Sequence, residues 1–337
     1  MSRSEIRIDL EALRRNVRTL LDALAGAELW AVVKADGYGH GAADAGHAAL
    51  EAGATALCVA TVGEGVALRR AVPGARILVL GPTQAVREAR DERLELCVSA
   101  APIPEDVPVH VKLDTGMGRY GFRELPTLPQ NVVGLMTHLA TADVDLAFAE
   151  RQLERFRAGV GEPGPFTLHA ANSAAALRLP AARLDAARCG IALYGLSPFG
   201  TDPAEDGLEP VLSWRSELAQ VKRLEPGEST GYGRGFVAAE ATWIGLVPVG
   251  YADGFRRDLT GTQVLVGGEP RRVVGTISMD SFAVELGGEL AVGTPVTLIG
   301  DGLLAEHHAR VAGTITYELA SRIDSRPERA TRTVSGA

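Results

Sequence analysis

The sequence predicts an α/β protein with an N-terminal (β/α)8 barrel and a mainly β C-terminal domain. Between Glu28 and about Ala187, short apolar runs alternate with amphipathic segments rich in Ala and Arg, which is typical of a parallel sheet with crossover helices. After Pro198 the apolar segments become strand-like and are separated by glycine and proline turns. The length of 337 residues suits two domains, which we place at residues 9–200 and at residues 201–337 with 1–8.

The barrel domain begins with a helix from Leu10 to about Ala25, which Asp9 is positioned to cap. An open doubly wound sheet would give a similar pattern, because the runs at 94–98 and 184–187 are short. We favour the barrel because polar residues and glycines recur at the carboxyl ends of the strands, where barrel enzymes build their sites. Eight apolar runs predict its strands at 28–33, 55–60, 76–81, 94–98, 108–113, 132–137, 166–169 and 184–187.

The second domain is predicted from strands that are punctuated by turns such as Pro226-Gly227 and Gly267-Gly268. Residues 1–8, with alternating Ile6 and Ile8, can pair into the same sheet. Helical periodicity returns only at 304–323. The predicted strands lie at 212–224, 242–249, 263–266, 271–277, 281–285 and 295–299.

Composition excludes several classes of function. A net charge of −8 argues against binding of nucleic acid or of an anionic membrane, since either needs a basic surface. The 3 cysteines form no Cys-x-x-Cys pair, so we expect reduced thiols in a cytoplasmic protein. No apolar run resembles a signal peptide or a membrane span. No metal site is predicted, because the adjacent His307 and His308 would point to different faces of a helix.

The most informative segment is 31–42, in which an apolar strand runs into Lys34, a turn broken by glycine and a helix start. Burial lowers the pKa of a lysine, which suits it to a Schiff base with an aldehyde cofactor. Alternatively, Lys34 is an ordinary lysine at a strand end. The segment closely resembles the cofactor-lysine motif of the alanine racemases, which use pyridoxal 5'-phosphate (PLP). The resemblance implies that Lys34 binds PLP covalently and that Tyr38 contacts the cofactor phosphate.

Two later segments supply donors of the kind that a phosphate requires. The run at 169–174 follows a strand and opens a helix, and the run at 188–195 is rich in small and apolar residues. In the same family, residues that match Ser173 and the backbone amides of Gly190 and Ile191 contact the phosphate. Taken alone, the first run would be read as a simple helix cap.

Arg188 and His138 match family residues that contact the cofactor ring. The resemblance places Arg188 against the pyridine nitrogen, and a guanidinium keeps its proton at working pH. The ring nitrogen then stays largely unprotonated, which makes the cofactor a weaker electron sink and disfavours transamination. The resemblance also implies that His138 stacks on the ring and helps to hold the arginine.

The run at 111–121 is a second long match to the family. Arg119 resembles the arginine beside the substrate carboxylate and the cofactor's phenolic oxygen, a role that suits its fixed bidentate fork. Lys112 matches a lysine that is carbamylated in several family members and that braces this arginine.

Racemisation removes the α-proton from one face of the substrate and returns a proton to the other, which favours two opposed bases. Tyr232, in the glycine-flanked run 227–234, resembles the family's catalytic tyrosine. That tyrosine enters from the partner subunit, so the resemblance implies a homodimer with shared active sites.

Three further positions in the second domain match family site residues. Tyr251 resembles a tyrosine that gates substrate access, and Met279 matches the residue whose amide holds the substrate carboxylate. Tyr317 resembles a second tyrosine near the phosphate. The chain departs from the family at Ser278, where members often carry Cys.

The resemblance therefore implies a cytoplasmic alanine racemase that supplies D-alanine for peptidoglycan. A racemase of the same fold that prefers serine or a larger amino acid is an alternative. A non-catalytic PLP-binding barrel protein is a second alternative, but it explains neither the second domain nor Tyr232. A decarboxylase of related fold would be expected to carry a cysteine in an acidic loop, and we find none.

Overall fold

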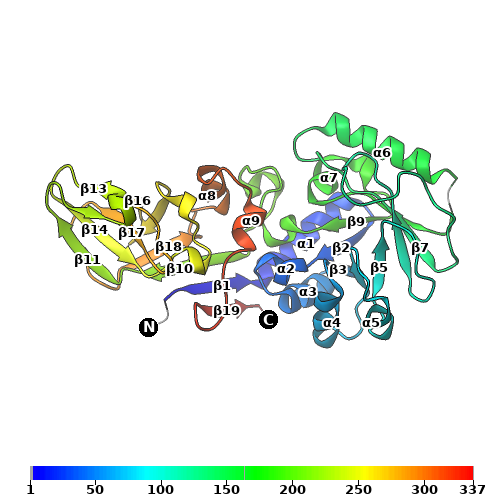
Figure 1. The fold of residues 1–337 in the computed structure, drawn as a ribbon, viewed down its shortest axis with the longest axis horizontal. Coiled ribbons are helices and arrows are strands. Elements are labelled where there is room, and N and C mark those ends of the chain that lie inside the picture. Colours follow the sequence, from blue (N-terminus) through cyan, green and yellow to red (C-terminus); the bar gives the residue numbers. More distant parts are fainter. Residues whose placement is uncertain (1–2, 163, 337) are drawn as a thin grey trace. The chain divides into compact units, whose positions relative to one another are not determined.

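The computed structural model describes residues 3–162 and 164–336 and divides the chain into two compact units (Figure 1). Residues 11–209 form one unit, and the residues up to Leu10 with those from Pro210 onward form the other. The division therefore lies beyond position 200, because the following residues stay on the first unit. The Asn16 side chain holds them there, donating to Leu193 O and Glu209 O and accepting from Glu209 N at 3.1, 2.8 and 2.7 Å.

The first unit is a closed barrel of parallel strands that are joined in sequence order. The last strand pairs with the first, with Leu29 opposite Ala187, so the barrel rather than the open sheet is confirmed. The two short runs both lie at strands, Glu95–Val98 and Ala186–Cys189, in which every residue except Glu95 is buried. The strands are β2 (Glu28–Val32), β3 (Ala56–Val59), β4 (Ile77–Val79), β5 (Glu95–Val98), β6 (Val109–Lys112), β7 (Val132–Met136), β8 (Thr167–His169) and β9 (Ala186–Cys189).

Helices surround the barrel, as Figure 1 shows for the segments coloured blue to green. Short 3-10 turns at Pro180–Ala182, Ile191–Tyr194 and Pro203–Asp206 join or follow the last elements. The helices are α1 (Leu10–Leu24), α2 (Lys34–Tyr38), α3 (Ala42–Glu51), α4 (Val62–Ala71), α5 (Val86–Asp91), α6 (Leu146–Val160) and α7 (Ser173–Arg178). Among the residues that the structure describes, no helix is long and apolar enough to cross a membrane.

The interior of the barrel contains polar residues as well as apolar ones. The ring of Trp30 on β2 lies 5.5 Å from that of His110 on β6 and 4.5 Å from that of His169 on β8. Strands β2 and β6 are not neighbours in the sheet, so these rings meet inside the barrel. Such layers of side chains from alternate strands are typical of this fold.

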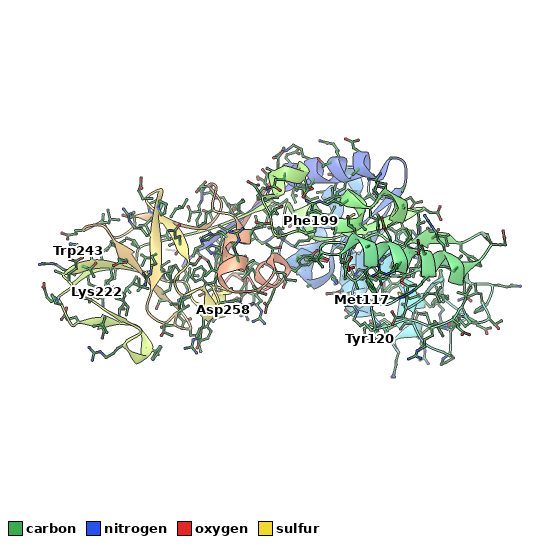
Figure 2. The ribbon with its side chains drawn as sticks, turned by 90° about the horizontal axis from the view of Figure 1, so that it is seen from above. Met117, Tyr120, Phe199, Lys222, Trp243 and Asp258 are labelled. Atoms are coloured by element: carbon green, nitrogen blue, oxygen red, sulfur yellow. The ribbon has the colours of Figure 1, made fainter. Side chains whose placement is uncertain are left out.

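The second unit contains a nine-stranded sheet in the order β11-β14-β17-β16-β15-β18-β10-β1-β19. Strand β1 pairs antiparallel with β10 and parallel with β19. Figure 2 labels Lys222 and Trp243 on the paired strands β11 and β14. The strands are β1 (Glu5–Asp9), β10 (Leu212–Glu217), β11 (Gln220–Leu224), β14 (Thr242–Val247), β15 (Gln263–Val266), β16 (Glu269–Val274), β17 (Phe282–Leu286), β18 (Pro295–Ile299) and β19 (Thr331–Ser335).

Two details of this unit differ from the sequence prediction. The expected strand at 212–224 is two strands, β10 and β11, which are separated at Leu218 and Ala219. Strand β19 was not predicted, because its residues alternate between exposed and half-buried and carry little apolar pattern. The smaller elements are the hairpin β12 (Ser229–Thr230) and β13 (Phe236–Val237), helices α8 (Ala305–Val311) and α9 (Thr316–Ala320), and 3-10 turns at Tyr232–Arg234, Tyr251–Asp253 and Arg257–Leu259.

Candidate active site

Lys34 lies just beyond β2, where the chain enters a left-handed turn. Residues 35–38 all have positive φ, between 50° and 61°, and only Gly37 among them lacks a side chain. The turn brings the Tyr38 ring to the lysine, with Nζ 6.0 Å from the ring centroid. Burial lowers the pKa of Lys34, and the positive charge of Arg119 lowers it further. Lys34 is thus more readily available as a neutral amine than an exposed lysine.

Two carboxylates hold this turn in place. Left-handed backbone costs about 1–2 kcal/mol per residue that is not glycine, so the conformation needs support. The amide of Ala35 donates to Glu64 Oε1 at 2.8 Å, and the amide of Ala42 donates to Asp36 Oδ1 at 2.9 Å. Glu64 also belongs to the capping box of α4, in which its amide donates to the Thr61 side chain. The Lys34 turn is therefore tied to the loop that follows β3.

Donors suited to a phosphate gather beside Tyr38. The side chain of Tyr38 is buried, and a Cβ atom added to Gly190 would lie only 2.4 Å from its hydroxyl oxygen. The amides of Gly190 and Ala192 donate to Ser173 Oγ at 3.0 and 3.4 Å. The hydroxyl groups of Tyr38 and Ser173 and the amides of Gly190 and Ala192 thus lie close together, and glycine is required at position 190 for the close approach. This donor set fits a phosphate.

Arg188, on β9, is buried and is held by uncharged acceptors. Its Nη1 donates to His169 Nδ1 at 2.7 Å and to His169 O at 3.0 Å. Its Nη2 donates to Thr137 O at 2.8 Å and to Ala170 O at 3.2 Å, and lies 3.4 Å from His138 Nδ1. Among the described residues no carboxylate forms an ion pair with it. Arg188 therefore brings an unneutralised positive charge into the barrel, and burial lowers its pKa.

The loop after β6 carries Arg119. Asp114 shapes this loop, because its Oδ1 accepts from the amides of Gly116 and Gly118 at 3.0 and 3.1 Å. The loop also carries Met117 and Tyr120, which Figure 2 labels in the barrel unit. Lys112 is buried at the end of β6, with its Nζ 6.0 Å from the centroid of the Tyr120 ring.

The cationic side chains of the barrel unit that were described above influence one another; they are Lys34, Lys112, Arg119 and Arg188. Burial lowers the pKa of Lys112, and it holds the pKa of His138 well below its ordinary value. The charges of Arg119 and Arg188 act in the same direction on both groups. His138 is therefore neutral at physiological pH. A cluster of this kind suits a ligand that carries several negative charges.

In the second unit, the loops of Tyr232, Tyr251 and Met279 are joined by hydrogen bonds. The Thr276 hydroxyl donates to Tyr232 O at 2.9 Å. The amide of Tyr251 donates to Ser278 O at 3.0 Å, only two residues further along that segment. These side chains project outward: Tyr232, Tyr251 and Met279 are 75%, 43% and 52% exposed.

Tyr317 lies on α9 and is half-buried. The next residue, Glu318, forms an ion pair with Arg256, which follows the Tyr251 turn. The predicted site residues of the second unit thus belong to one connected group of loops. The structure therefore assembles Lys34, Tyr38, Arg119, His138, Ser173, Arg188, Gly190 and Ile191 in one unit, and Tyr232, Tyr251, Met279 and Tyr317 in the other.

Sequence reasoning assigned no role to three residues that support this site. Glu64 was detectable, because Thr61 and Glu64 have the spacing of a capping box before a helix. Asp114 is placed where an aspartate commonly folds a glycine-rich loop. His169 had only the signal of a polar residue that ends a buried strand, and its contact with Arg188 requires the fold.

Comparisons with known proteins agree over nearly the whole chain. Residues 8–198 match the family model "Alanine racemase, N-terminal domain", and residues 211–331 match "Alanine racemase, C-terminal domain". The alanine racemase of Ligilactobacillus salivarius is 40% identical, over 96% of this chain and 96% of that protein. The alanine racemase of Streptomyces coelicolor is 41% identical, over 97% and 95%. The crystal structure of alanine racemase from E. faecalis is similar with a TM-score of 0.91 and 36% identity, over 99% of this chain and 98% of that chain.

Proposed function

The chain belongs to the alanine racemase family and interconverts L-alanine and D-alanine, and we propose that it does so with PLP bound to Lys34. The D-alanine serves peptidoglycan synthesis, which is the general role of the family. The observation that carries the cofactor proposal is the turn that brings Lys34, Tyr38 and the donors around Gly190 together. A lysine with a lowered pKa, beside hydroxyl and amide donors of the kind that bind a phosphate, fits PLP.

The barrel residues have separate roles in this proposal. Bound PLP supplies an aldehyde and an electron-withdrawing ring that weaken the α-C–H bond of an attached amino acid. Tyr38, Ser173 and the amides of Gly190 and Ile191 would hold its phosphate. Arg188 would donate to the pyridine nitrogen without giving up its own proton, which would leave that nitrogen unprotonated. His138 would pack on the ring as a neutral imidazole.

The substrate is held by its carboxylate. Arg119 offers a bidentate guanidinium, and its exposure in the isolated chain leaves it accessible to a ligand. The Met279 amide is a second donor, and Tyr251 gates the path to the site. Tyr317 is a second tyrosine near the cofactor phosphate. Carbamylation of Lys112 would replace its positive charge with a negative one, and in that form Lys112 would brace Arg119.

Two bases move the α-proton. The Lys34 amine acts on one face of the substrate and the Tyr232 hydroxyl acts on the other, so neither group has to cross the substrate. Tyr232 is 75% exposed in the single chain, so its hydroxyl is accessible to a second chain. We therefore propose a homodimer in which Tyr232 completes the site of the partner subunit.

The free and buried thiols of Cys58, Cys97 and Cys189 fit a reducing cytoplasm. The net charge of −8 argues against a nucleic-acid partner.

The test is an absorbance spectrum of the purified protein with and without borohydride, followed by an assay of L-alanine to D-alanine conversion. We expect a yellow chromophore that borohydride bleaches and that Lys34→Ala abolishes. A reducible adduct that survives in Lys34→Ala would refute the assignment. Turnover of L-serine and L-lysine in the same assay separates alanine from the alternative substrates.

A further inference from the structure

A continuous chain of hydrogen bonds runs through the barrel interior from Arg188 to Glu95. Arg188 Nη1 lies 2.7 Å from His169 Nδ1, and His169 Nε2 lies 2.9 Å from His110 Nδ1. His110 Nε2 in turn lies 2.8 Å from Glu95 Oε2. Glu95 is the first residue of β5, so the chain connects the site end of the barrel with its opposite end.

The two ends of the chain determine its direction. A guanidinium has only donors, so Arg188 must donate and His169 Nδ1 must accept. His169 then carries its proton on Nε2 and donates to His110 Nδ1. His110 consequently carries its proton on Nε2 and donates to Glu95. Both imidazoles are neutral, in agreement with the low pKa values that burial gives to His110 and His169.

The residues packed around this series of hydrogen bonds fit closely against it. His110 and His169 are completely buried. A Cβ atom at Gly134, the residue opposite His110 on β7, would lie 2.1 Å from His110 Nδ1, so glycine is required there. Trp30 packs against both imidazole rings. A buried donor or acceptor that lost its partner here would cost about 1–3 kcal/mol, so the order of donors is strongly constrained.

Glu95 is the acceptor on which this order depends. Its Oε1 accepts from Arg76 Nε at 2.8 Å while its Oε2 faces His110. A carboxylate is the only common side chain that accepts at both oxygens. Both neighbours can therefore donate to Glu95 at the same time.

We propose that Glu95 is a positioning residue for Arg188, which it influences through His110 and His169. As the terminal acceptor it fixes both imidazoles with the proton on Nε2, and it thereby keeps His169 Nδ1 free to accept from Arg188. The consequence for catalysis rests on the function of Arg188 proposed above, whereas the positions of the protons do not.

The protons can be observed directly by NMR with ¹⁵N-labelled histidine in the holoenzyme. For the wild type we expect two neutral imidazoles at His110 and His169, each protonated on Nε2 and protected from exchange with solvent. His110→Asn and His169→Asn assign the two signals. Protonation of His169 on Nδ1, or a charged imidazole at either position, would overturn the proposal.

The variant Glu95→Gln tests the role of the second acceptor. Glutamine offers one oxygen and one amide group to two donors. If its oxygen stays with Arg76, its amide donates to His110 Nε2 and the direction of the chain reverses. We expect His169 to show a population protonated on Nδ1, and we expect kcat to fall by about tenfold with KM within about twofold.

The double variant with Arg76→Met is the matched rescue. Removing the competing donor allows the glutamine oxygen to accept from His110, so the protons and kcat return to within about twofold of the wild type. Arg76→Met alone is the control and keeps the wild-type protonation, since Glu95 still accepts from His110. Unchanged histidine protonation in Glu95→Gln, or a loss that Arg76→Met does not rescue, would overturn the proposal. Failure of the wild type to bind PLP or to racemise alanine would instead refute the proposed function and leave the NMR result standing.

Discussion

At the scale of single residues, the chemistry of this site depends on which charges lie next to buried groups. Arg188 has its Nη atoms directed at the backbone oxygens of Thr137, His169 and Ala170, and it has no carboxylate partner among the described residues. A positive group that is held by neutral acceptors keeps its full charge, and in the proposed complex this charge faces the PLP ring. The same position occupied by a carboxylate would hold a proton on the ring nitrogen.

Arg188→Glu should therefore change the course of the reaction as well as its rate. We expect racemisation to fall by about a hundredfold, while pyruvate formed by transamination rises relative to racemisation. Arg188→Lys is the control, because it keeps the positive charge and should lose rate without gaining pyruvate. Chiral chromatography and a pyruvate assay measure both products. The same ratio of pyruvate to racemised alanine in the two variants would contradict the role proposed for the charge of Arg188.

The buried histidines make stability depend on pH. Burial lowers the pKa values of His110, His138 and His169, and it lowers that of His308 to about 4. The unfolded chain binds protons near pH 6.5 while the folded chain does not, so stability is lost as the pH falls below that value. The expected slope is about 1.4 kcal/mol per pH unit for each such histidine.

Urea unfolding between pH 7.5 and pH 5.0 measures this slope. His308→Asn lies in the second unit and should reduce the slope there without an effect on PLP binding. A free energy of unfolding that stays constant over this range would show that the histidines are charged in the folded protein.

At the scale of elements, the loops at the carboxyl ends of β2 and β3 are joined by hydrogen bonds to the same side chain. Glu64 accepts from Ala35 N at 2.8 Å and from Ala60 N at 2.7 Å, so a single carboxylate joins the two loops. The left-handed turn after Lys34 is unfavourable without such contacts. Glu64 thus connects the cap of α4 with the orientation of Lys34.

Glu64→Ala should reduce both stability and activity. We expect a loss of about 1 kcal/mol for the helix cap, and a fall in kcat because Lys34 is less well oriented. Glu88→Ala is the matched control, since Glu88 is exposed in the first turn of α5. Thermal melting and steady-state kinetics compare the two variants. Equal effects of Glu64→Ala and Glu88→Ala on kcat would contradict the inference that Glu64 orients Lys34.

The elements also show how far the sequence could predict the fold. The barrel strands were predicted within one or two residues, because strands buried on both faces read as apolar runs. The break between β10 and β11 was missed, since Leu218 and Ala219 carry no turn signal. Strand β19 was missed because what defines it is its pairing with β1, at the other end of the chain.

For the site, the sequence provided positions and the fold provided the contacts. Lys34 and Arg188 stand in motifs with local signals, so both could be proposed from the sequence. The contact of Arg188 with His169 and the chain onward to Glu95 join β9, β8, β6 and β5. A short sequence pattern does not indicate which side chains from different strands contact one another inside a barrel.

At the scale of the whole molecule, the two proposed bases lie in different units of the chain. Lys34 is in the barrel unit and Tyr232 is in the sheet unit, where its ring is exposed. We have proposed that the partner subunit supplies the tyrosine. Each site of the dimer then needs Lys34 from one chain and Tyr232 from the other.

A mixture of two inactive variants tests this arrangement. Lys34→Ala and Tyr232→Phe should each lose activity by about 10²–10⁴-fold or more, because each removes a proton-transfer group. Tyr232→Phe should still bind PLP, since the tyrosine does not hold the cofactor. After subunit exchange, a hybrid dimer has one site with both bases intact and one site with neither. We expect the mixture to recover up to about a quarter of the wild-type activity, since half of the dimers are hybrid and each has one intact site of two.

The control for this experiment is a mixture of Lys34→Ala with a double variant that carries both changes, which contains no intact site in any pairing. Mass spectrometry of differently labelled chains verifies that exchange has occurred. If each chain instead used its own Tyr232, every site in the hybrid would lack one base, and the mixture would stay inactive. Absence of recovery with verified exchange therefore places both bases on one chain and rejects the shared site.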